Sequence, residues 1–201
     1  MRGEMAEFVN VAVDAMGGDH APKEIIKGAV EAVNESSHVK VFLTGQEEVI
    51  RRELSGYTYN QKQVGVVPAS EIIETAEPPV MAIRKKKDSS IVKALTLVKE
   101  GQCDAYVSAG STGATLVGGQ IIVGRIKGVE RPPLAPLIPT ENGCALLIDC
   151  GANVDARPSH LVQFAKMGSV YMESVVGIAN PKVAIVNIGA EEEKGNALVK
   201  E

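Results

Sequence analysis

The segment from Ser108 to Ala114 combines glycines with hydroxyl side chains and reads Ser-Ala-Gly-Ser-Thr-Gly-Ala. Glycine lets the backbone approach a ligand closely, and a helix that begins just afterwards offers unpartnered N–H groups and the positive end of its dipole. Ser111 and Thr112 add hydroxyl donors, so the amides from Gly110 to Gly113 have the chemistry of a phosphate cradle. An ordinary turn from a strand into a helix, with a serine N-cap, is the alternative interpretation.

The same segment differs from three better-known motifs. The chain contains no Gly-Lys-Ser/Thr, which excludes a Walker A loop, and the G-x-x-G spacing is not a dinucleotide-binding fingerprint. The segment matches the nucleophile elbow G-x-S-x-G except that Ala109 takes the first position. A serine hydrolase using Ser111 would take its acid from Asp149 or Asp155. Its histidine would be His160, which is otherwise expected to be an exposed residue in the first turn of a helix.

A run of four cations, Arg84 to Lys87, lies just before Ser89 and Ser90. Such a run is commonly a solvated face. Here it precedes a predicted helix N-terminus with two serines, where an anion would meet positive charge, hydroxyls and free amides together. Substrate phosphate and an acidic partner protein are both candidate ligands.

The segment from Asp14 to Pro22 places two aspartates and a histidine around a pair of glycines. His20 could act as a general base or orient an anion. Asp19 has the alternative interpretation of a turn or cap residue. Metal binding needs more ligands than this segment offers, so neither a metal nor a cofactor is predicted.

Composition excludes several classes of protein. A net charge of −4 disfavours binding to a phosphate backbone, and 3% aromatic residues with no Trp disfavour stacking on single-stranded nucleic acid.

The three cysteines, Cys103, Cys144 and Cys150, have no CxxC spacing and indicate reduced, buried thiols in a cytoplasmic protein. Cys150 could in principle hold an acyl group. Residues 1–10 do not resemble a signal peptide, and no apolar run reaches the length of a membrane span.

Short apolar runs alternate with helical patterns, which predicts an α/β fold with a mostly parallel sheet and helices on both faces. Strands are predicted at Phe8–Asp14, Val39–Thr44, Val64–Pro68, Asp104–Ser108, Cys144–Asp149 and Lys182–Ile188. Helices are predicted from Pro22 to Val33, at Glu47–Leu54, from Ser89 to Gly101, at Ala114–Val123 and from a Ser159 N-cap to Val176. The stretch Glu191–Glu201 has helix-forming composition.

Ligands in such sheets bind beyond the carboxyl ends of strands, which selects the turns after Asp14, Ser108, Asp149 and Ile188. The only candidate boundary is the proline-rich stretch 131–139, so residues 1–201 are predicted to form a single α/β domain.

Together, five segments in this order resemble the PlsX family: Asp14 to Pro22, Arg84 to Ser90, Ser108 to Ala114, Asp149 to Asn153, and Asn187 to Gly189 with Lys194 and Gly195. The resemblance covers nearly the whole chain. Members of this family are bacterial phosphate acyltransferases, which make acyl-phosphate from acyl-acyl carrier protein and inorganic phosphate for phospholipid synthesis.

The resemblance implies a fold like that of isocitrate and isopropylmalate dehydrogenases and phosphotransacetylase. It also implies a homodimer that associates peripherally with the inner face of the cell membrane. Family chains run well beyond Glu201, so this chain is predicted to be the N-terminal part of a longer protein. Ala190 stands where the family more often has Glu, so no acid chemistry is expected at that position.

The implied reaction is attack of a phosphate oxygen on a thioester carbonyl, with a thiolate leaving. Positioning can supply on the order of 7–11 kcal/mol for such a step, and oxyanion donors roughly 3–4 kcal/mol. The residues assigned to phosphate are Arg84, Lys86, Ser89, Ser90, Gly110, Ser111, Thr112 and Gly113. His20 or Asn153 would donate to the carbonyl oxygen. The helix from Leu161 to Val176 could line an acyl slot, although packing in a core or an interface is the simpler use of its apolar side chains.

Two other classes of function remain open. One is the hydrolase or thioesterase that would use Ser111 as its nucleophile. The other is a module that binds acyl carrier protein without catalysis. A dinucleotide-dependent oxidoreductase is disfavoured by the absence of its fingerprint.

Overall fold

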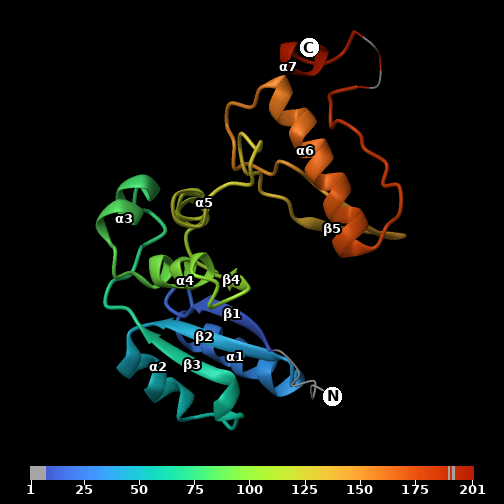
Figure 1. Cartoon of the computed structure of the whole chain (residues 1–201). Helices are drawn as coiled ribbons and strands as arrows, with labels where there is room; N and C mark the ends of the chain where they lie inside the picture. Colours follow the sequence, from blue (N-terminus) through green and yellow to red (C-terminus); the bar gives the residue numbers. More distant parts are fainter. Residues whose placement is uncertain (1–7, 190, 192) are drawn as a thin grey trace. The chain divides into compact units, whose positions relative to one another are not determined.

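The computed structural model describes residues 8–189, 191 and 193–201 (Figure 1). The chain divides into two compact units, Met1–Gly124 and Arg125–Glu201, with the division a few residues before the proline-rich stretch. The single domain over residues 1–201 stays a prediction. Residues 1–7 lie outside the described residues, and they are most of the segment predicted not to be a signal peptide. Ala190 also lies outside them.

The first unit is built on a parallel sheet with the strand order β3-β2-β1-β4. The strands are β1 (Val9–Asp14), β2 (Val39–Gly45), β3 (Val64–Pro68) and β4 (Ala105–Val107). All four coincide with predicted strands, and the parallel α/β arrangement is confirmed for this unit. Strand β1 is central, with Val11 paired to Val41 on one side and to Ala105 on the other.

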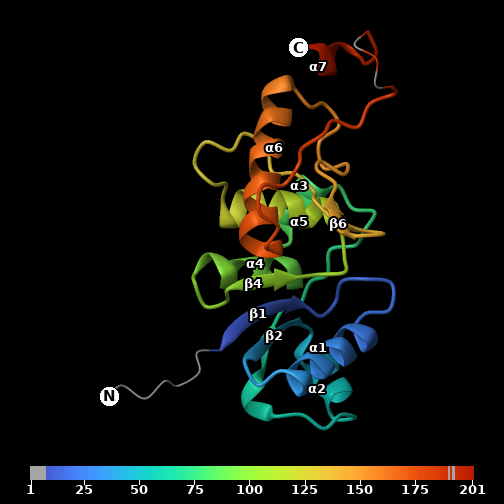
Figure 2. The ribbon, with the colours of Figure 1, turned by 90° about the vertical axis from the view of Figure 1, so that its right-hand side faces the viewer.

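Helices cover both faces of this sheet (Figure 2). The helices of this unit are α1 (Lys23–Glu35), α2 (Glu47–Leu54), α3 (Pro79–Lys85), α4 (Ser90–Lys99) and α5 (Thr112–Gly118), which continues as a π-helical segment, Gly119–Val123. A short 3-10 turn, Gln61–Gln63, precedes β3. Alternate residues of a strand point to opposite faces. Val13 therefore packs against α1 and α2, whereas Ala12 packs with Ala94 of α4.

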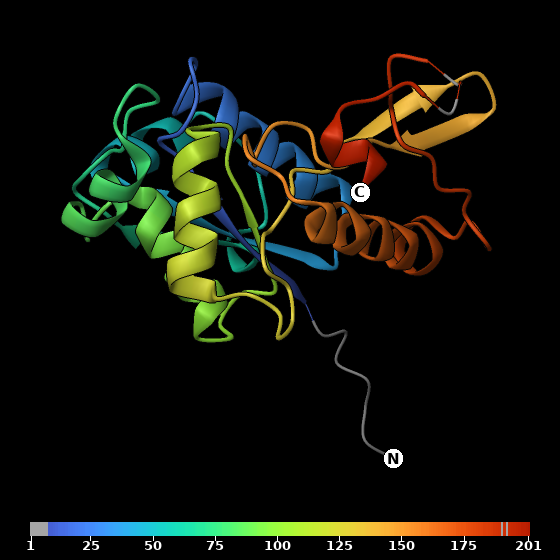
Figure 3. The same cartoon turned by 90° about the horizontal axis from the view of Figure 1, so that it is seen from above.

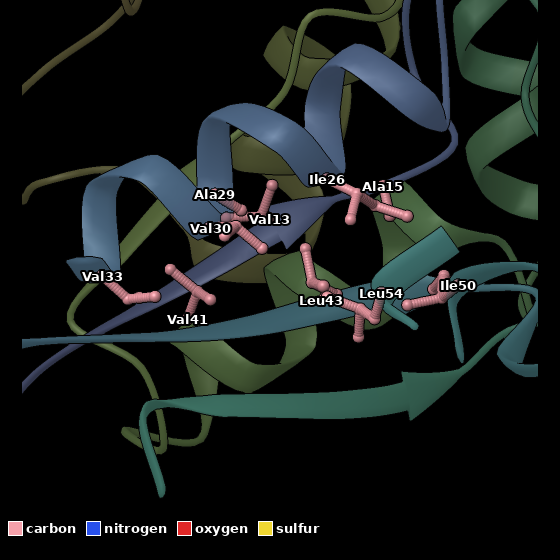
Figure 4. Close-up of a cluster of buried hydrophobic side chains, with 10 residues drawn as sticks. All are labelled: Val13, Ala15, Ile26, Ala29, Val30, Val33, Val41, Leu43, Ile50 and Leu54. Atoms are coloured by element: carbon pink, nitrogen blue, oxygen red, sulfur yellow. The ribbon is translucent and has the colours of Figure 1, made fainter. Parts of the chain in front are cut away.

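The core between the sheet, α1 and α2 is aliphatic (Figure 4). Ile26 of α1, Leu43 of β2 and Ile50 of α2 are each fully buried there. The apolar stripe of α1 predicted from Ile25 to Val33 supplies one side of this core. Burial of such side chains contributes about 1.5–3 kcal/mol each, so this cluster fixes the sheet that carries the loops described below.

The second unit contains an antiparallel hairpin of β5 (Leu137–Thr140) and β6 (Gly143–Leu146), drawn side by side in Figure 3. Its helices are α6 (Pro158–Tyr171), which continues as a π-helical segment, Met172–Val176, and α7 (Ala197–Lys200). Helix α7 forms inside the stretch with helix-forming composition. In the described residues, no helix is long and apolar enough to cross a membrane.

Three predictions for the second unit are wrong. The strand predicted at Cys144–Asp149 ends at Leu146 and pairs antiparallel with a strand from the proline-rich stretch. Lys182–Ile188 forms no strand, because a strand needs a neighbour for its backbone groups, and Val186 is 84% exposed. Helix α6 begins after Arg157 and not at a Ser159 cap, since Pro158 takes the first helical position, where a missing N–H costs nothing.

Candidate anion-binding site

The strand order of the first unit reverses at β1: β2 and β3 follow on one side of it, and β4 pairs with it on the other side. In open α/β sheets, ligands bind at the carboxyl ends of the strands at such a switch point. Strand β1 ends at Asp14 and is followed by the loop to Pro22, and the loop after β4 leads from Ser108 into α5. The switch point therefore brings together two of the segments that the sequence selects.

Asp14 and Ser108 join these two loops. Asp14 is 0% exposed, and its Oδ2 accepts a hydrogen bond from Ser108 Oγ at 2.7 Å. Ser108 Oγ in turn accepts from the Gly110 N–H at 3.0 Å, and Asp14 Oδ1 accepts from the Met16 N–H at 3.2 Å. Neither residue was among the predicted site residues. The available signal was a charged side chain at the end of an apolar strand.

The two loops also touch backbone to backbone. A Cβ added to Gly17 would overlap Asp14 Oδ2 and come within 3.0 Å of Gly110 Cα. Gly18 has a φ of +113°, which favours glycine, and a Cβ there would lie 3.2 Å from the Ala109 Cβ. The glycines therefore let the loop that carries His20 lie directly against the loop that carries Ser111.

Ser111 is the N-cap of α5, as the alternative interpretation of this segment predicts. Its buried Oγ accepts from the Ala114 N–H at 3.2 Å. Helix α5 begins at Thr112, two residues before the predicted start at Ala114. The N–H groups of Ser111, Thr112 and Gly113 donate to no other described residue, whereas that of Gly110 is taken by Ser108. Three consecutive amides are thus available to an anion.

Helix α3 was not predicted, and it packs against α5. A Cβ on Gly113 would lie 2.6 Å from Pro79 Cγ of α3, and Ile83 of α3 shares a buried cluster with Ala114 of α5. Arg84 lies in the last turn of α3. Arg84 and Lys85 are both exposed, and neither forms an ion pair with another described residue.

Lys86 is engaged within the protein. Its Nζ lies 2.5 Å from Glu77 Oε1 and donates to the Ile72 carbonyl at 2.6 Å. The hydrogen bond from Lys86 and a backbone hydrogen bond lower the pKa of Glu77 below its ordinary value. Binding of phosphate by Lys86 stays a prediction, and it would require Lys86 to share or leave Glu77.

Ser89 and Ser90 are 0% and 1% exposed at the start of α4. Ser89 Oγ accepts from the Val92 N–H at 3.4 Å, so Ser89 is the N-cap of α4. The Ser90 N–H donates to the Glu71 carbonyl, and the Ser90 carbonyl accepts from Thr44 Oγ1 at 2.9 Å. These contacts fix the beginning of α4 beside the sheet. Direct contact of either serine with phosphate stays a prediction.

The two predicted catalytic residues belong to different units. His20 is exposed on the loop after β1. Asn153 lies in the second unit, where its Nδ2 donates to the Pro132 carbonyl at 3.1 Å and to Asp149 Oδ2 at 3.2 Å. Donation to the carbonyl oxygen by His20 or Asn153 stays a prediction.

Asp149 organises the loop that carries Asn153. Burial alone raises the pKa of Asp149, but hydrogen bonds from the N–H groups of Leu134, Asn153 and Ala152 outweigh it, so that the pKa is lowered. A carboxyl with a lowered folded-state pKa stabilises the fold above its unfolded pKa, about 3.9, and that stability is lost as the pH falls through the folded pKa.

We therefore expect the amides of Leu134 and Asn153 to lose protection from hydrogen exchange when the pH is lowered below about 4. The measurement is amide exchange by NMR between pH 6 and pH 2.5. An Asp149→Asn variant should show weak protection of both amides even at pH 6. Equal protection in the variant and the parent would contradict this role for Asp149.

His160 and the cysteines differ from their predicted environments. His160 is 4% exposed, not exposed as expected, because its Nδ1 accepts from the Arg157 N–H and its Nε2 lies 3.1 Å from Glu130 Oε2. Both ring nitrogens are thus occupied, which disfavours His160 as the base of a serine hydrolase. All three cysteines are free, but only Cys103 is buried and Cys150 is exposed. Burial raises the pKa of the Cys103 thiol.

A cavity of about 580 Å³ lies within the second unit. Apolar side chains of α6, including Leu161 and Phe164, and Met172 of the π-helical segment that follows line part of it. The apolar positions of the predicted helix Leu161 to Val176 thus face a cavity as well as a core.

Comparisons with solved structures define the class of fold. The chain is similar to a phosphotransacetylase from Streptococcus pyogenes, with a TM-score of 0.70 and 18% identity over 96% of this chain and 61% of that one. It is also similar to the EutD phosphotransacetylase from Staphylococcus aureus, with a TM-score of 0.60 and 19% identity over 85% of this chain and 54% of that one. The chain therefore has the α/β fold seen in phosphotransacetylases.

Sequence comparison gives the family. Residues 9–201 match the model of the family described as fatty acid synthesis protein, and the chain belongs to this family, the PlsX family that the motifs indicate. It is 56% identical over 192 residues to the phosphate acyltransferase of Clostridium perfringens and 55% identical to that of Clostridium beijerinckii. These alignments cover 96% of this chain but only 57% and 58% of the relatives. The chain thus spans little more than half the length of these curated relatives.

Proposed function

We propose that this chain belongs to an enzyme that transfers a fatty acyl group from acyl-acyl carrier protein to inorganic phosphate, giving acyl-phosphate for phospholipid synthesis. The observation that carries the proposal is the 56% identity, over 96% of the chain, to a protein named phosphate acyltransferase. The free amides at the switch point of the sheet support it, because they suit a phosphate nucleophile.

The chemistry asks for positioning more than for proton transfer. Inorganic phosphate is partly dianionic at neutral pH and can attack a thioester carbonyl directly, while the carrier thiolate leaves. The amides of Ser111, Thr112 and Gly113 would hold phosphate, and the exposed Arg84 of α3 would add positive charge. His20 would donate to the carbonyl oxygen as negative charge develops there.

The proposal extends to partners, location and fold family. We infer that the complete protein is a homodimer in the cytoplasm, with peripheral contact with the inner face of the membrane. Its fold would be related to that of isocitrate and isopropylmalate dehydrogenases. The exposed Arg84 and Lys85 suit an acidic partner protein as well as phosphate.

The direct test mixes the chain with an acyl-acyl carrier protein and follows thiol release with and without inorganic phosphate, using the Clostridium perfringens relative as positive control. Phosphate-dependent release with acyl-phosphate as product is the expected result. Phosphate-independent release, with labelling of Ser111 by a fluorophosphonate, would support the hydrolase instead. Binding of the carrier with no turnover of the thioester would support a binding module.

Ser111→Ala should weaken the use of phosphate. Loss of the N-cap costs about 0.5–2 kcal/mol and loosens the first turn of α5, so we expect the KM for phosphate to rise about tenfold. Ser111→Thr keeps the hydroxyl and is the matched control. The measurement is the phosphate dependence of thiol release, together with the thermal unfolding midpoint. Unchanged phosphate dependence in Ser111→Ala would remove Ser111 from the site.

A further inference from the structure

Asp14 is a buried carboxylate without a cation. It is 0% exposed, and it forms no ion pair with the described residues around it. Its hydrogen-bond donors are neutral: the Ser108 hydroxyl and the Met16 N–H. Burying a charge is costly unless it is paired or well hydrogen-bonded. A residue that serves only packing would not need this charge.

The hydrogen bonds of Asp14 lead to the loop that holds the free amides. Because Ser108 donates its only proton to Asp14, its oxygen lone pairs are directed to the Gly110 N–H, which donates to it at 3.0 Å. Gly110 is also fixed from the other side by Gly17, since a Cβ on Gly110 would lie 3.0 Å from Gly17 Cα. The backbone at Gly110 sets the direction of the next three N–H groups.

We propose that Asp14 and Ser108 are positioning residues: Asp14, through Ser108, holds the backbone at Gly110 so that the amides of Ser111 to Gly113 point to one phosphate. The inference rests on the proposed function for the identity of the anion, and it extends that function to two residues outside the predicted site. Asp14 acts without touching phosphate. Its charge strengthens the Ser108 hydrogen bond and keeps that hydroxyl from turning toward the ligand.

The test measures the dissociation constant for inorganic phosphate by NMR, from the shifts of the amides of residues 110–113, in the parent chain and five variants. We expect Asp14→Asn and Ser108→Ala each to weaken phosphate binding about tenfold. The double variant should bind phosphate as tightly as the single variant with the larger loss of affinity, because both changes break the same hydrogen-bonded chain. Ser108→Thr keeps the hydroxyl and should bind phosphate within about twofold of the parent.

Asp104→Asn is the matched control. Asp104 Oδ2 accepts from the Asn10 N–H at 2.8 Å and joins the same two strands at the opposite end of the sheet. If Asp14 had only a structural role, Asp14→Asn would lower the unfolding midpoint and, like the control, leave phosphate binding unchanged. That result, additive effects in the double variant, or a parent chain that binds no phosphate would each overturn the inference.

The experiment distinguishes failure of this inference from failure of the proposed function. Phosphate binding is measured without turnover, so the coupling of Asp14 to Ser108 can hold in a chain that releases no thiol. In an active preparation, the two single variants should raise the KM for phosphate while the KM for acyl-acyl carrier protein stays within about twofold. A parallel rise in both KM values would contradict positioning of phosphate by these residues.

Discussion

Gly17→Ala is expected to lower phosphate-dependent thiol release on the order of 100-fold. The added Cβ would overlap the carboxylate of Asp14 and press on Gly110 Cα at 3.0 Å, so the loops after β1 and β4 would have to move apart. Displacement of about 1 Å at a positioned reactant can cost about two orders of magnitude in rate. Overpacking of this kind should also destabilise the first unit by about 1–3 kcal/mol. The measurements are kcat/KM for phosphate and the denaturant midpoint.

Gly28→Ala is the control, because it makes the same substitution at a glycine outside the two loops. Gly28 lies inside α1, and an added Cβ would meet nothing within 4 Å. Alanine there should stabilise the helix by about 0.5–1 kcal/mol and leave thiol release unchanged. If both glycine variants kept full activity, the close packing of the two loops would have no role in the reaction.

The largest loss of stability is expected from Leu43→Ala. Leu43 is 0% exposed in the middle of β2, and it packs in the cluster formed with α1 and α2. Truncation of such a side chain removes buried apolar surface and leaves a cavity, which costs about 2–5 kcal/mol. Urea unfolding followed by circular dichroism measures the change.

Val9→Ala is the control for this change. Val9 begins β1 in the same sheet but is 49% exposed. Its truncation should cost less than about 1 kcal/mol, since little burial is lost. Equal effects of the two variants would show that the cluster does not hold the sheet together.

The first unit could be predicted well because its local patterns are unambiguous. The apolar stripe of α1 and the run at Val39–Thr44 each allow one structure, and the glycine at position 45 ends the strand as expected. Helix α3, which begins at Pro79, was not predicted. Pro79 at the first helical position was the signal that the prediction did not use.

In the second unit, local pattern was not enough. Lys182–Ile188 has the apolar run of a buried strand, but strand formation depends on a neighbour that local sequence does not specify. The burial of His160 depends on Glu130, which lies 30 positions away. Neither partner can be found from spacing alone.

For the site, the sequence indicated the loops but not how they are joined. Ser111 and Gly113 were predicted from their own segment, and the structure places that segment at the switch point. The role of Asp14 depends on Ser108, 94 positions away, and the engagement of Lys86 depends on Glu77. Such pairs are formed by topology, so only the folded chain shows which donors are already occupied.

The position of β1 between β2 and β4 also has a consequence for how the protein is made. Ribosomes deliver the chain from its N-terminus, so β2 and β3 are available for pairing well before β4 at Ala105–Val107. Until β4 emerges, one edge of β1 has no partner and is open to strands of other chains. The hydrogen bond from Ser108 to Asp14 spans 94 positions, so the loops after β1 and β4 meet through a slow, non-local contact that requires β4.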